Sequence, residues 1–364
     1  MKRIYFTVTN DLTYDQRMQR ICNTLSQNGY DVTLIGRKLP ASLPLIKENY
    51  HQKRIRCLFT KGKMFYTEYN TRLFFYLLFN RMDAICAVDL DTILPCFFIS
   101  KLRSIKRIYD AHELFSEMKE VITRKRIKRI WTKIEKFAVP KFKNGYTVSD
   151  GIAEEFFQRH KVEYKIIKNV PILKPLEKNV LAKEKFILYQ GAVNEARGFE
   201  YLIPAMQWIN CKLVICGDGN FMHQFKELIK KHHLENKIEL KGMLPPQELL
   251  EIAKRATIGI ALAEKEGLNQ YHALPNKFFD YIHAGLPQIS MNFPEYVKIN
   301  QQYEVAVLID DLSPEKIAAT VNNLLADTVL YLRLQANCIR AREVFNWQHE
   351  EKKLLAFYQS VLKN

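Results

Sequence analysis

A lysine and a carboxylate lie three residues apart at the start of a predicted helix in segment 274–287, LPNKFFDYIHAGLP. Pro275 suits the first turn of a helix, where its missing N–H is not needed. Lys277 and Asp280 would lie on one side of that turn. The free N–H groups and the positive dipole end of such a helix attract phosphate. Taken alone, this segment fits an ordinary helix with a charged and exposed end better than an anion site, and the rest of the chain reverses that order.

The same segment carries its own packing and stop signals. Phe278, Phe279 and Ile282 recur at helical spacing and predict a face that packs on a neighbouring element. Gly285 and Pro287 then end the helix and lead into a strand at 288–291. The predicted anion site is thus held between a buried helix face and a sheet.

Two glycine segments follow predicted strands in the same half of the chain. In GAVNEARG, Gly191 permits close approach of the backbone to a ligand, and Arg197 offers a forked guanidinium for phosphate oxygens. An arginine at a helix start is often only solvated, so this signal is weak alone. Gly217 opens a second segment, GDGNFM, whose third fingerprint glycine is replaced by Met222. We therefore exclude NAD binding there and expect either a tight turn or a phosphate contact.

Ionisable side chains also end two strands of the N-terminal half. His112 follows the strand RIYD and could hydrogen-bond a substrate hydroxyl, although a structural His–Asp pair fits as well. Asp89 and Asp91 follow the strand AICAV. Paired carboxylates can serve a metal or acid–base chemistry, but helix capping is the stronger interpretation for at least one of them.

Segment 119–143 is the most basic in the chain, with ten Lys and Arg residues against Glu120 and Glu135. An apolar stripe that includes Trp131 and Phe137 runs through it. A basic amphipathic helix of this kind favours contact with an anionic membrane surface. Packing of the stripe on a sheet, with a solvated basic face, is the alternative, and the two can coexist. No nucleic-acid module accompanies the charge, so we expect no nucleic-acid binding.

The bulk properties agree with a protein that meets anions. The chain has 364 residues and a formal net charge of +16. Its seven cysteines form no CxxC pair and indicate reduced core thiols, with neither disulfides nor a zinc site. The N-terminus shows no secretory signal, and the longest apolar runs are shorter than a membrane span. We expect a cytoplasmic protein, which the basic segment would place on the inner face of the membrane.

Strand and helix patterns alternate along both halves, which is typical of parallel α/β sheets. The predicted strands are 3–8, 31–36, 54–59, 84–88, 107–110, 145–149 and 164–168, then 186–191, 211–217, 237–242, 257–263, 288–291 and 305–309. The predicted helices between them include 14–28, 69–80, 92–103, 124–138 and 150–160, then 198–209, 223–234 and 246–256. Three further helices are predicted at 314–326, 328–344 and 347–362.

This pattern predicts two tandem Rossmann-like, doubly wound domains with a ligand at the carboxyl edges of their strands. The expected division is an N-terminal acceptor domain at 1–170, a linker at 171–185 and a C-terminal nucleotide-sugar domain at 186–345. The linker is Lys-rich and carries two prolines. The last segment, 346–364, is expected to cross back to the first domain.

With these segments assembled, the chain resembles family 4 of the retaining, nucleotide-sugar-dependent glycosyltransferases, in bacterial members with an NKxFxY-type donor-site motif. The resemblance implies the GT-B fold, in which two such domains face a central cleft. It rests on VDLDTILP, RIYDAHELFSE, ILYQGAVNEARGFEYLI, LVICGDG and LPNKFFDYIHAGLP. Asp280 takes the second Glu position of the family's E-x7-E motif, and Arg197 takes the Lys position of R-x4-K. His272 and Ala192 replace the first residue of each motif, and TNDLTYDQR replaces the first glycine-rich loop.

The resemblance implies a role for each candidate residue. Asp280 would accept hydrogen bonds from the ribose diol, while Arg197 and Lys277 would neutralise the diphosphate leaving group. His112 and His272 would face the donor sugar. The candidate catalytic residues are His112, Arg197, Lys277 and Asp280. The candidate donor-binding residues are Gly191, Asn194, Arg197, Gly217, His272, Asn276, Lys277, Phe278 and Asp280.

The function implied is a metal-independent, retaining hexosyltransferase of cell-surface polysaccharide or glycolipid biosynthesis. It needs no cofactor, because the nucleoside diphosphate sugar, of UDP or GDP type, is its donor substrate. The acceptor would be lipid-linked or a saccharide. Two alternatives stay open: a catalytically inactive scaffold or partner subunit that binds nucleotide sugar, and a sugar-nucleotide epimerase of related architecture.

Overall fold

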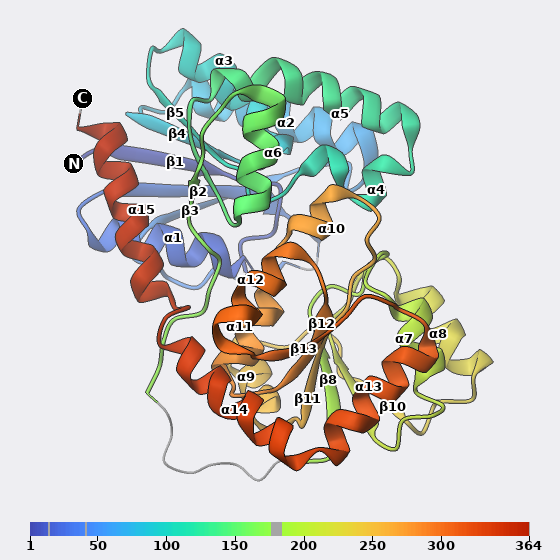
Figure 1. Cartoon of the computed structure of the whole chain (residues 1–364). Helices are drawn as coiled ribbons and strands as arrows, with labels where there is room; N and C mark the ends of the chain where they lie inside the picture. Colours follow the sequence, from blue (N-terminus) through green and yellow to red (C-terminus); the bar gives the residue numbers. More distant parts are fainter. Residues whose placement is uncertain (14, 41, 176–183, 364) are drawn as a thin grey trace. The chain divides into compact units, whose positions relative to one another are not determined.

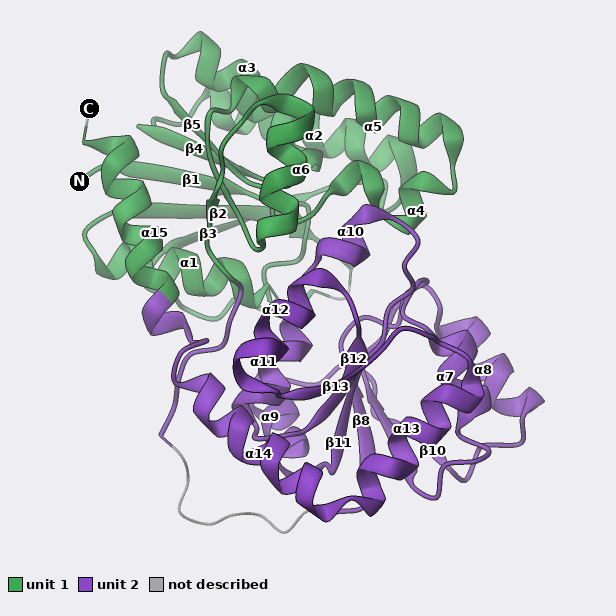
Figure 2. Cartoon of the chain, viewed as in Figure 1, with its two compact units in different colours: residues 1–168, 350–364 green, residues 169–349 purple. Residues whose placement is uncertain are grey.

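The computed structural model describes residues 1–13, 15–40, 42–175 and 184–363, which form two compact units (Figure 2). Unit 1 comprises residues 1–168 and the segment from Glu350 onward, and unit 2 comprises residues 169–349. The predicted linker, 171–185, belongs to unit 2 where it is described, and its residues 176–183 lie outside the described residues. Trp347 N–H donates to the Pro171 carbonyl at 2.8 Å, which fixes the first part of that segment.

A seven-stranded parallel sheet forms the centre of unit 1, in the order β3-β2-β1-β4-β5-β6-β7 (Figure 1). Its strands are β1 (Arg3–Thr7), β2 (Asp31–Lys38), β3 (His51–Arg56), β4 (Ala84–Val88), β5 (Lys106–Asp110), β6 (Asn144–Thr147) and β7 (Lys165–Ile166). All five residues of β4 are buried, as a parallel strand covered on both faces requires. The strand order reverses at β1, whose Ile4 pairs with Val32 on one side and with Ala84 on the other.

Helices join these strands and cover the sheet. They are α1 (Gln16–Gln27), α2 (Gly62–Leu78), α3 (Ile93–Leu102), α4 (Lys119–Ile122), α5 (Lys125–Ala138) and α6 (Asp150–His160). Side-chain caps start two of them: Asp15 accepts the Met18 N–H of α1, and Ser149 accepts the Ile152 N–H of α6.

The last helix, α15 (Trp347–Leu362), packs on the sheet of unit 1 through its C-terminal part. Tyr358 is buried, with its ring centroid 6.0 Å from that of Phe6 on β1 and its hydroxyl 3.3 Å from that of Tyr146 on β6. At the start of this part, Glu350 accepts the Lys168 N–H at 2.9 Å. Helix α15 thereby completes the core of unit 1 around β1 and β6.

Unit 2 is built on a six-stranded parallel sheet in the order β10-β9-β8-β11-β12-β13 (Figure 1). The strands are β8 (Phe186–Gln190), β9 (Lys212–Cys216), β10 (Ile238–Leu240), β11 (Ile258–Ala261), β12 (Gln288–Met291) and β13 (Ala306–Ile309). The helices are α7 (Phe199–Ala205), α8 (Met222–Lys231), α9 (Pro246–Arg255), α10 (Leu268–His272), α11 (Asn276–His283), α12 (Pro294–Tyr303), α13 (Pro314–Ala326) and α14 (Thr328–Arg342).

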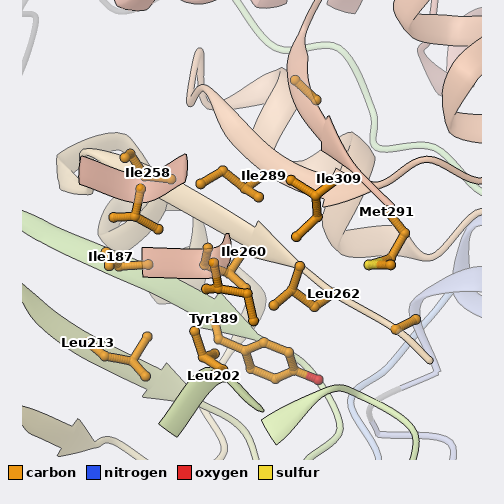
Figure 3. Close-up of a cluster of buried hydrophobic side chains, with 14 of the residues drawn as sticks. Ile187, Tyr189, Leu202, Leu213, Ile258, Ile260, Leu262, Ile289, Met291 and Ile309 are labelled. Atoms are coloured by element: carbon orange, nitrogen blue, oxygen red, sulfur yellow. The ribbon is translucent and has the colours of Figure 1, made fainter. Parts of the chain in front are cut away.

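Alternate residues of these strands face opposite sides, and both sides are buried. Ile187 and Tyr189 of β8 point into one core with side chains of β9, β11, β12 and β13 (Figure 3). Leu188 points to the other side, where it joins a cluster with Tyr281 of α11. Strand order reverses at β8, which lies between β9 and β11, and ligands of doubly wound sheets bind at the carboxyl edge beside such a reversal.

The architecture agrees with the predicted fold class, because both sheets are parallel and doubly wound. Every predicted strand overlaps an observed one. The differences from the prediction lie in polar segments. Helix α2 begins at Gly62 instead of residue 69, and β3 begins at His51 instead of residue 54. Helices α10 and α12 were not predicted. Within the described part of the chain, every helix falls short of the length and apolar character that crossing a bilayer requires.

Candidate functional site

The loops that follow β8 and β9 touch each other through glycines. A Cβ atom added to Gly217 would lie 1.8 Å from the Gly191 carbonyl oxygen, and one added to Gly219 would lie 2.3 Å from the Val193 oxygen. Gly191 itself has a φ of +114°, a conformation that side chains disfavour. Its N–H donates to the Cys216 carbonyl at 2.9 Å. The glycines therefore hold two strand ends together, and this packing role for Gly217 needs no ligand.

Asn194 fixes the same pair of loops through its side chain. Its Oδ1 accepts the Asn220 N–H at 3.1 Å, and Asn220 in turn accepts the Glu195 N–H at 3.3 Å. The predicted donor-binding residue Asn194 thus shapes the loop backbone next to Gly191.

Lys277 crosses the end of β8 from the first turn of α11. Its Nζ lies 3.6 Å from the ring centroid of Tyr189, and only 9% of the residue is exposed. A Cβ atom on Gly191 would lie 3.8 Å from this Nζ, so the lysine lies directly over the glycine. Burial, and then the nearby Arg197 guanidinium, hold the pKa of Lys277 well below its ordinary value, while Asp280 opposes them.

Asp280 lies one turn further along α11 and is held by the last residue of β8. Gln190 donates from Nε2 to Asp280 Oδ2 at 2.8 Å. Gln190 is buried, and its Oε1 has no hydrogen-bond partner among the described residues. The buried Gln190 amide therefore fixes the Asp280 carboxylate on the same helix as Lys277.

Tyr281 joins the helix to the sheet at the point where strand order reverses. Its hydroxyl accepts the Gln190 N–H at 3.2 Å and lies 3.0 Å from the Leu188 carbonyl and 3.3 Å from that of Ile260. Gly259 leaves room for the ring, since a Cβ there would lie 2.5 Å from it. Tyr281 thus fixes α11 against β8 and β11.

Arg197 stands in a tight turn before α7. The flanking residues Ala196 and Gly198 have φ values of +64° and +72°, and the Ala196 carbonyl accepts the Glu264 N–H at 3.0 Å. This turn holds the half-buried Arg197 after β8, where its charge acts on Lys277 and lowers the pKa of that lysine. Two cations and a helix N-terminus therefore converge at one strand end.

The other candidate residues of unit 2 are Asn276, His272 and Phe278. Asn276 is exposed, and its Oδ1 accepts from Asn169 at 2.5 Å. His272 is half-buried at the end of α10, beside the ring of Tyr271. Phe278 is fully buried against Tyr296, and its N–H donates to the Pro275 carbonyl. The structure therefore brings together Gly191, Arg197, Lys277 and Asp280, and it places the Phe278 side chain in the core.

Gln190 and Tyr281 also contact this group of site residues, although neither was predicted from the sequence. Gln190 is the one polar residue in the buried strand FILYQ, at its carboxyl end, and Tyr281 is the tyrosine of the NKxFxY motif. Both signals were present, but their meaning depends on pairing across the sheet.

His112 belongs to a separate acidic group at the β4–β5 edge of unit 1. Its Nε2 lies 3.1 Å from Asp89 Oδ2, and Asp89 Oδ1 accepts the Glu113 N–H at 3.3 Å. Asp110 instead forms a fully buried, bidentate pair with Arg17, at 2.7 and 3.1 Å. His112 therefore pairs with an aspartate, as the alternative interpretation expected. That aspartate is Asp89, because Asp110 pairs with Arg17.

Neither carboxylate after β4 caps a helix by its side chain, which corrects the capping interpretation. Asp89 precedes a 3-10 turn but makes no capping bond, and Asp91 accepts from the Thr9 hydroxyl. Burial and the neighbouring Glu113 raise the pKa of Asp89 well above its ordinary value. Burial raises the pKa of Asp91 to about 7, against the Thr9 hydrogen bond.

The basic segment forms α4 and α5, and its half-buried tryptophan packs against two aromatic rings of unit 1. The ring centroid of Trp131 lies 4.8 Å from that of Phe115 and 5.3 Å from that of Tyr66. Trp131 therefore serves the packing of α5. Among the described residues, no group of three or more His, Cys, Asp or Glu side chains has the arrangement of a metal site.

Comparison with known proteins connects this geometry to one family. Residues 174–343 match the family model described as glycosyl transferases group 1. This stretch lies within unit 2 and contains Arg197, Lys277 and Asp280. MJ1607 of Methanocaldococcus jannaschii, named an uncharacterized glycosyltransferase, is 24% identical over 187 residues. The match covers 50% of this chain and 46% of that relative, so the chain spans less than half of the relative's length.

Solved structures match the whole chain. Sucrose-phosphate synthase from Thermosynechococcus elongatus has a TM-score of 0.80 at 15% identity and covers 100% of both chains. Anabaena HepE, solved in complex with UDP and glucose, has a TM-score of 0.75 at 12% identity, with 99% of this chain and 100% of that chain covered. These likenesses confirm the predicted fold class, two parallel-sheet α/β domains of the GT-B type.

Proposed function

We propose that the chain is a retaining glycosyltransferase that moves a sugar from a nucleoside diphosphate sugar to an acceptor hydroxyl. The observation that carries this proposal is the convergence of Lys277 and Arg197 at the end of β8, beside an Asp280 that Gln190 holds in place. The match of residues 174–343 to a glycosyltransferase family supports it.

In this proposal the diphosphate binds at the corner formed by Lys277, Arg197 and the N-terminus of α11. Fixed cations and backbone N–H groups there stabilise the negative charge that grows on the leaving group. The nearly buried position of Lys277 strengthens this interaction, because water screens it little. Protein cations supply this charge, so the transfer needs no metal ion.

Asp280 binds the ribose diol of the donor. A carboxylate accepts two hydroxyl hydrogen bonds, and the Gln190 amide holds it in one orientation. HepE, a structural neighbour, is solved with UDP and glucose, which favours a UDP donor over a GDP donor for this chain.

The chemical step exchanges one glycosidic bond for another. The bond from the anomeric carbon to the diphosphate breaks, and a bond from that carbon to the acceptor oxygen forms on the same face of the sugar. The acceptor proton passes to a leaving phosphate oxygen. His112, whose ring Asp89 orients, and His272 bind hydroxyls of the donor sugar in this proposal. The product belongs to cell-surface polysaccharide or glycolipid biosynthesis, with a lipid-linked or saccharide acceptor.

Thermal stabilisation by a panel of nucleotides and nucleotide sugars tests the donor site. One diphosphate should raise the melting temperature at sub-millimolar concentration, and Lys277→Ala should remove the effect. Arg197→Ala and Lys277→Ala should nearly abolish turnover, and full activity in both would refute the assignment.

His272 and Ala192, which replace two family motif residues, favour a second candidate: a silent scaffold that binds nucleotide sugar. That candidate predicts nucleotide stabilisation with neither transfer nor donor hydrolysis. An epimerase would instead interconvert the donor sugar with no acceptor present.

A further inference from the structure

Large apolar side chains gather in exposed positions on three helices of unit 1. Phe79 at the end of α2 is 80% exposed and Leu102 at the end of α3 is 66% exposed. The other members of the group are Phe75 on α2, Phe98 on α3, and Ile130 and Phe137 on α5. Monomeric soluble proteins seldom expose apolar groups of this size together without a use for them.

Contacts between α2 and α3 and between α3 and α5 make the helices that carry these side chains neighbours. Phe75 and Phe79 are four residues apart, as are Phe98 and Leu102, so each pair lies along one side of its helix. Arg103 joins the two helix ends, because its guanidinium donates to the carbonyls on either side of Phe79, those of Leu78 and Asn80.

The third helix joins the same layer through aromatic contact. The ring centroids of Phe97 on α3 and Phe137 on α5 lie 5.3 Å apart. The Lys141 ammonium lies 4.0 Å from the Phe137 ring centroid, so a cation already covers part of this edge. The three helices thus carry one exposed layer of phenylalanine and aliphatic side chains, which we name the α2–α3–α5 face.

The charge on this face is of one sign. Exposed lysines and arginines lie on the same helices as the apolar side chains: Lys101 on α3, and Lys125, Arg126, Arg129, Lys133 and Lys136 on α5. The acidic residues of the three helices, Glu68 and Glu135, are engaged elsewhere. Glu135 is buried against His160 at 2.8 Å, and Glu68 accepts from Arg72 and from the Leu58 and Phe59 N–H groups.

We infer that the α2–α3–α5 face docks on an anionic lipid bilayer, with Phe75 and Phe79 of α2 and Phe98 and Leu102 of α3 entering the interface and the lysines of α5 contacting headgroup phosphates. Aromatic side chains ringed by Lys and Arg match the apolar and anionic layers of such a surface. The apolar anchors come from α2 and α3, outside the basic segment 119–143, because the half-buried Trp131 packs against Phe115 and Tyr66. This inference goes beyond the proposed transfer reaction and does not depend on it.

Vesicle co-sedimentation of the full chain tests the inference. The wild-type chain should sediment with vesicles of phosphatidylcholine and phosphatidylglycerol in equal amounts, and weakly with phosphatidylcholine alone. Phe75→Ser with Phe79→Ser should weaken binding by more than about tenfold, because each buried phenylalanine contributes roughly that factor. Lys133→Ser with Lys136→Ser should cost about tenfold on the anionic vesicles and little on the neutral ones.

The matched control is Trp208→Ser, which removes an exposed aromatic side chain from unit 2 and should leave vesicle binding unchanged. Circular dichroism of each variant verifies folding. Equal, weak sedimentation of the wild type with both vesicles, or wild-type binding by the Phe75/Phe79 variant, would overturn the inference. A vesicle-free dimer that this variant dissociates would also overturn it, by assigning the face to a second copy of the chain.

Discussion

The ammonium nitrogen of Lys277 lies 3.6 Å from the centroid of the Tyr189 ring, so the only lysine of α11 is held on an aromatic face. The contact is favourable for a cation, yet burial and Arg197 disfavour the charge. An anion bound at the end of β8 would therefore favour the charged form of this lysine. This property leads to the first two predictions.

Replacing Lys277 by Met should separate stability from activity. The lysine is charged when the chain is unfolded and is penalised by burial when it is folded, so Met should leave the melting temperature equal or higher. Turnover should fall by about a hundredfold or more, as when a preorganised transition-state donor is removed. Calorimetry and a transfer assay measure the two effects. Lys226→Met, on the exposed side of α8, should change neither, and a turnover close to wild type would contradict the prediction.

Diphosphate binding should take up a proton through Lys277. The pKa of the free lysine is lowered, and a bound diphosphate raises it, so binding takes up protons between the two values and weakens as pH rises. Titration calorimetry with UDP, in two buffers of different ionisation enthalpy, measures this uptake over a series of pH values below 10.5, the ordinary pKa of lysine. Equal heats in both buffers would count against it, and Lys277→Met should remove the uptake.

Gln190 should contribute to ribose recognition through Asp280. In Gln190→Met the carboxylate loses its 2.8 Å hydrogen bond and the orientation that this bond fixes. The affinity for a ribonucleoside diphosphate should fall about tenfold. The affinity for the deoxyribonucleoside diphosphate should change less.

A double-mutant cycle with Asp280→Asn examines the same contact. Non-additive losses would show that the two residues act together, whereas additive losses would place Gln190 outside ribose recognition. The cycle can be interpreted only if the wild-type chain binds a diphosphate. Absence of wild-type binding would contradict the donor site itself and would not test the role of Gln190.

Unit 1 should lose stability as pH rises toward neutrality because of Asp91. Its folded pKa of about 7 exceeds the ordinary value of 3.8, so the folded state holds the proton over that interval and the unfolded state does not. Stability therefore falls as pH rises between these values and levels off above them.

In Asp91→Asn, the loss of unfolding free energy between low and neutral pH should be smaller by on the order of 2 kcal/mol. This value is less than the whole pKa shift would give, because the side chain is partly exposed. Urea unfolding at a series of pH values gives the comparison. Glu235→Gln on the surface of unit 2 should leave the slope intact. An unchanged slope in Asp91→Asn would mean that the carboxylate is already ionised.

The sequence predicted the strands well because a buried parallel strand needs a continuous apolar run. FILYQ and AICAV are such runs, and both are strands at nearly the predicted bounds. The edge strand HQKRIR is mostly polar, so its start was misplaced. Helix α12, PEYVKINQQY, buries only a few of its side chains, Tyr296 and Ile299 among them, and so has little periodic signal.

Part of the site was predictable from strand ends alone. Gly191, Lys277 and Asp280 were expected near one another because the loops after neighbouring parallel strands share an edge, and the structure brings them together. The partner of each side chain was not predictable. Whether Asp89 caps a turn or pairs with His112 depends on distances across the sheet that no local pattern contains.

The return of the chain to unit 1 has a consequence for its synthesis. Tyr358, which packs on Phe6 and Tyr146, follows the whole of unit 2 in the chain and is therefore translated after it. The strands of unit 1 are made first, but the buried surface that α15 covers stays open until the whole of unit 2 has been translated. Translation of unit 1 starts before that of unit 2, but unit 1 can complete its folding only after unit 2 has been made. Its sheet therefore needs protection from aggregation during elongation.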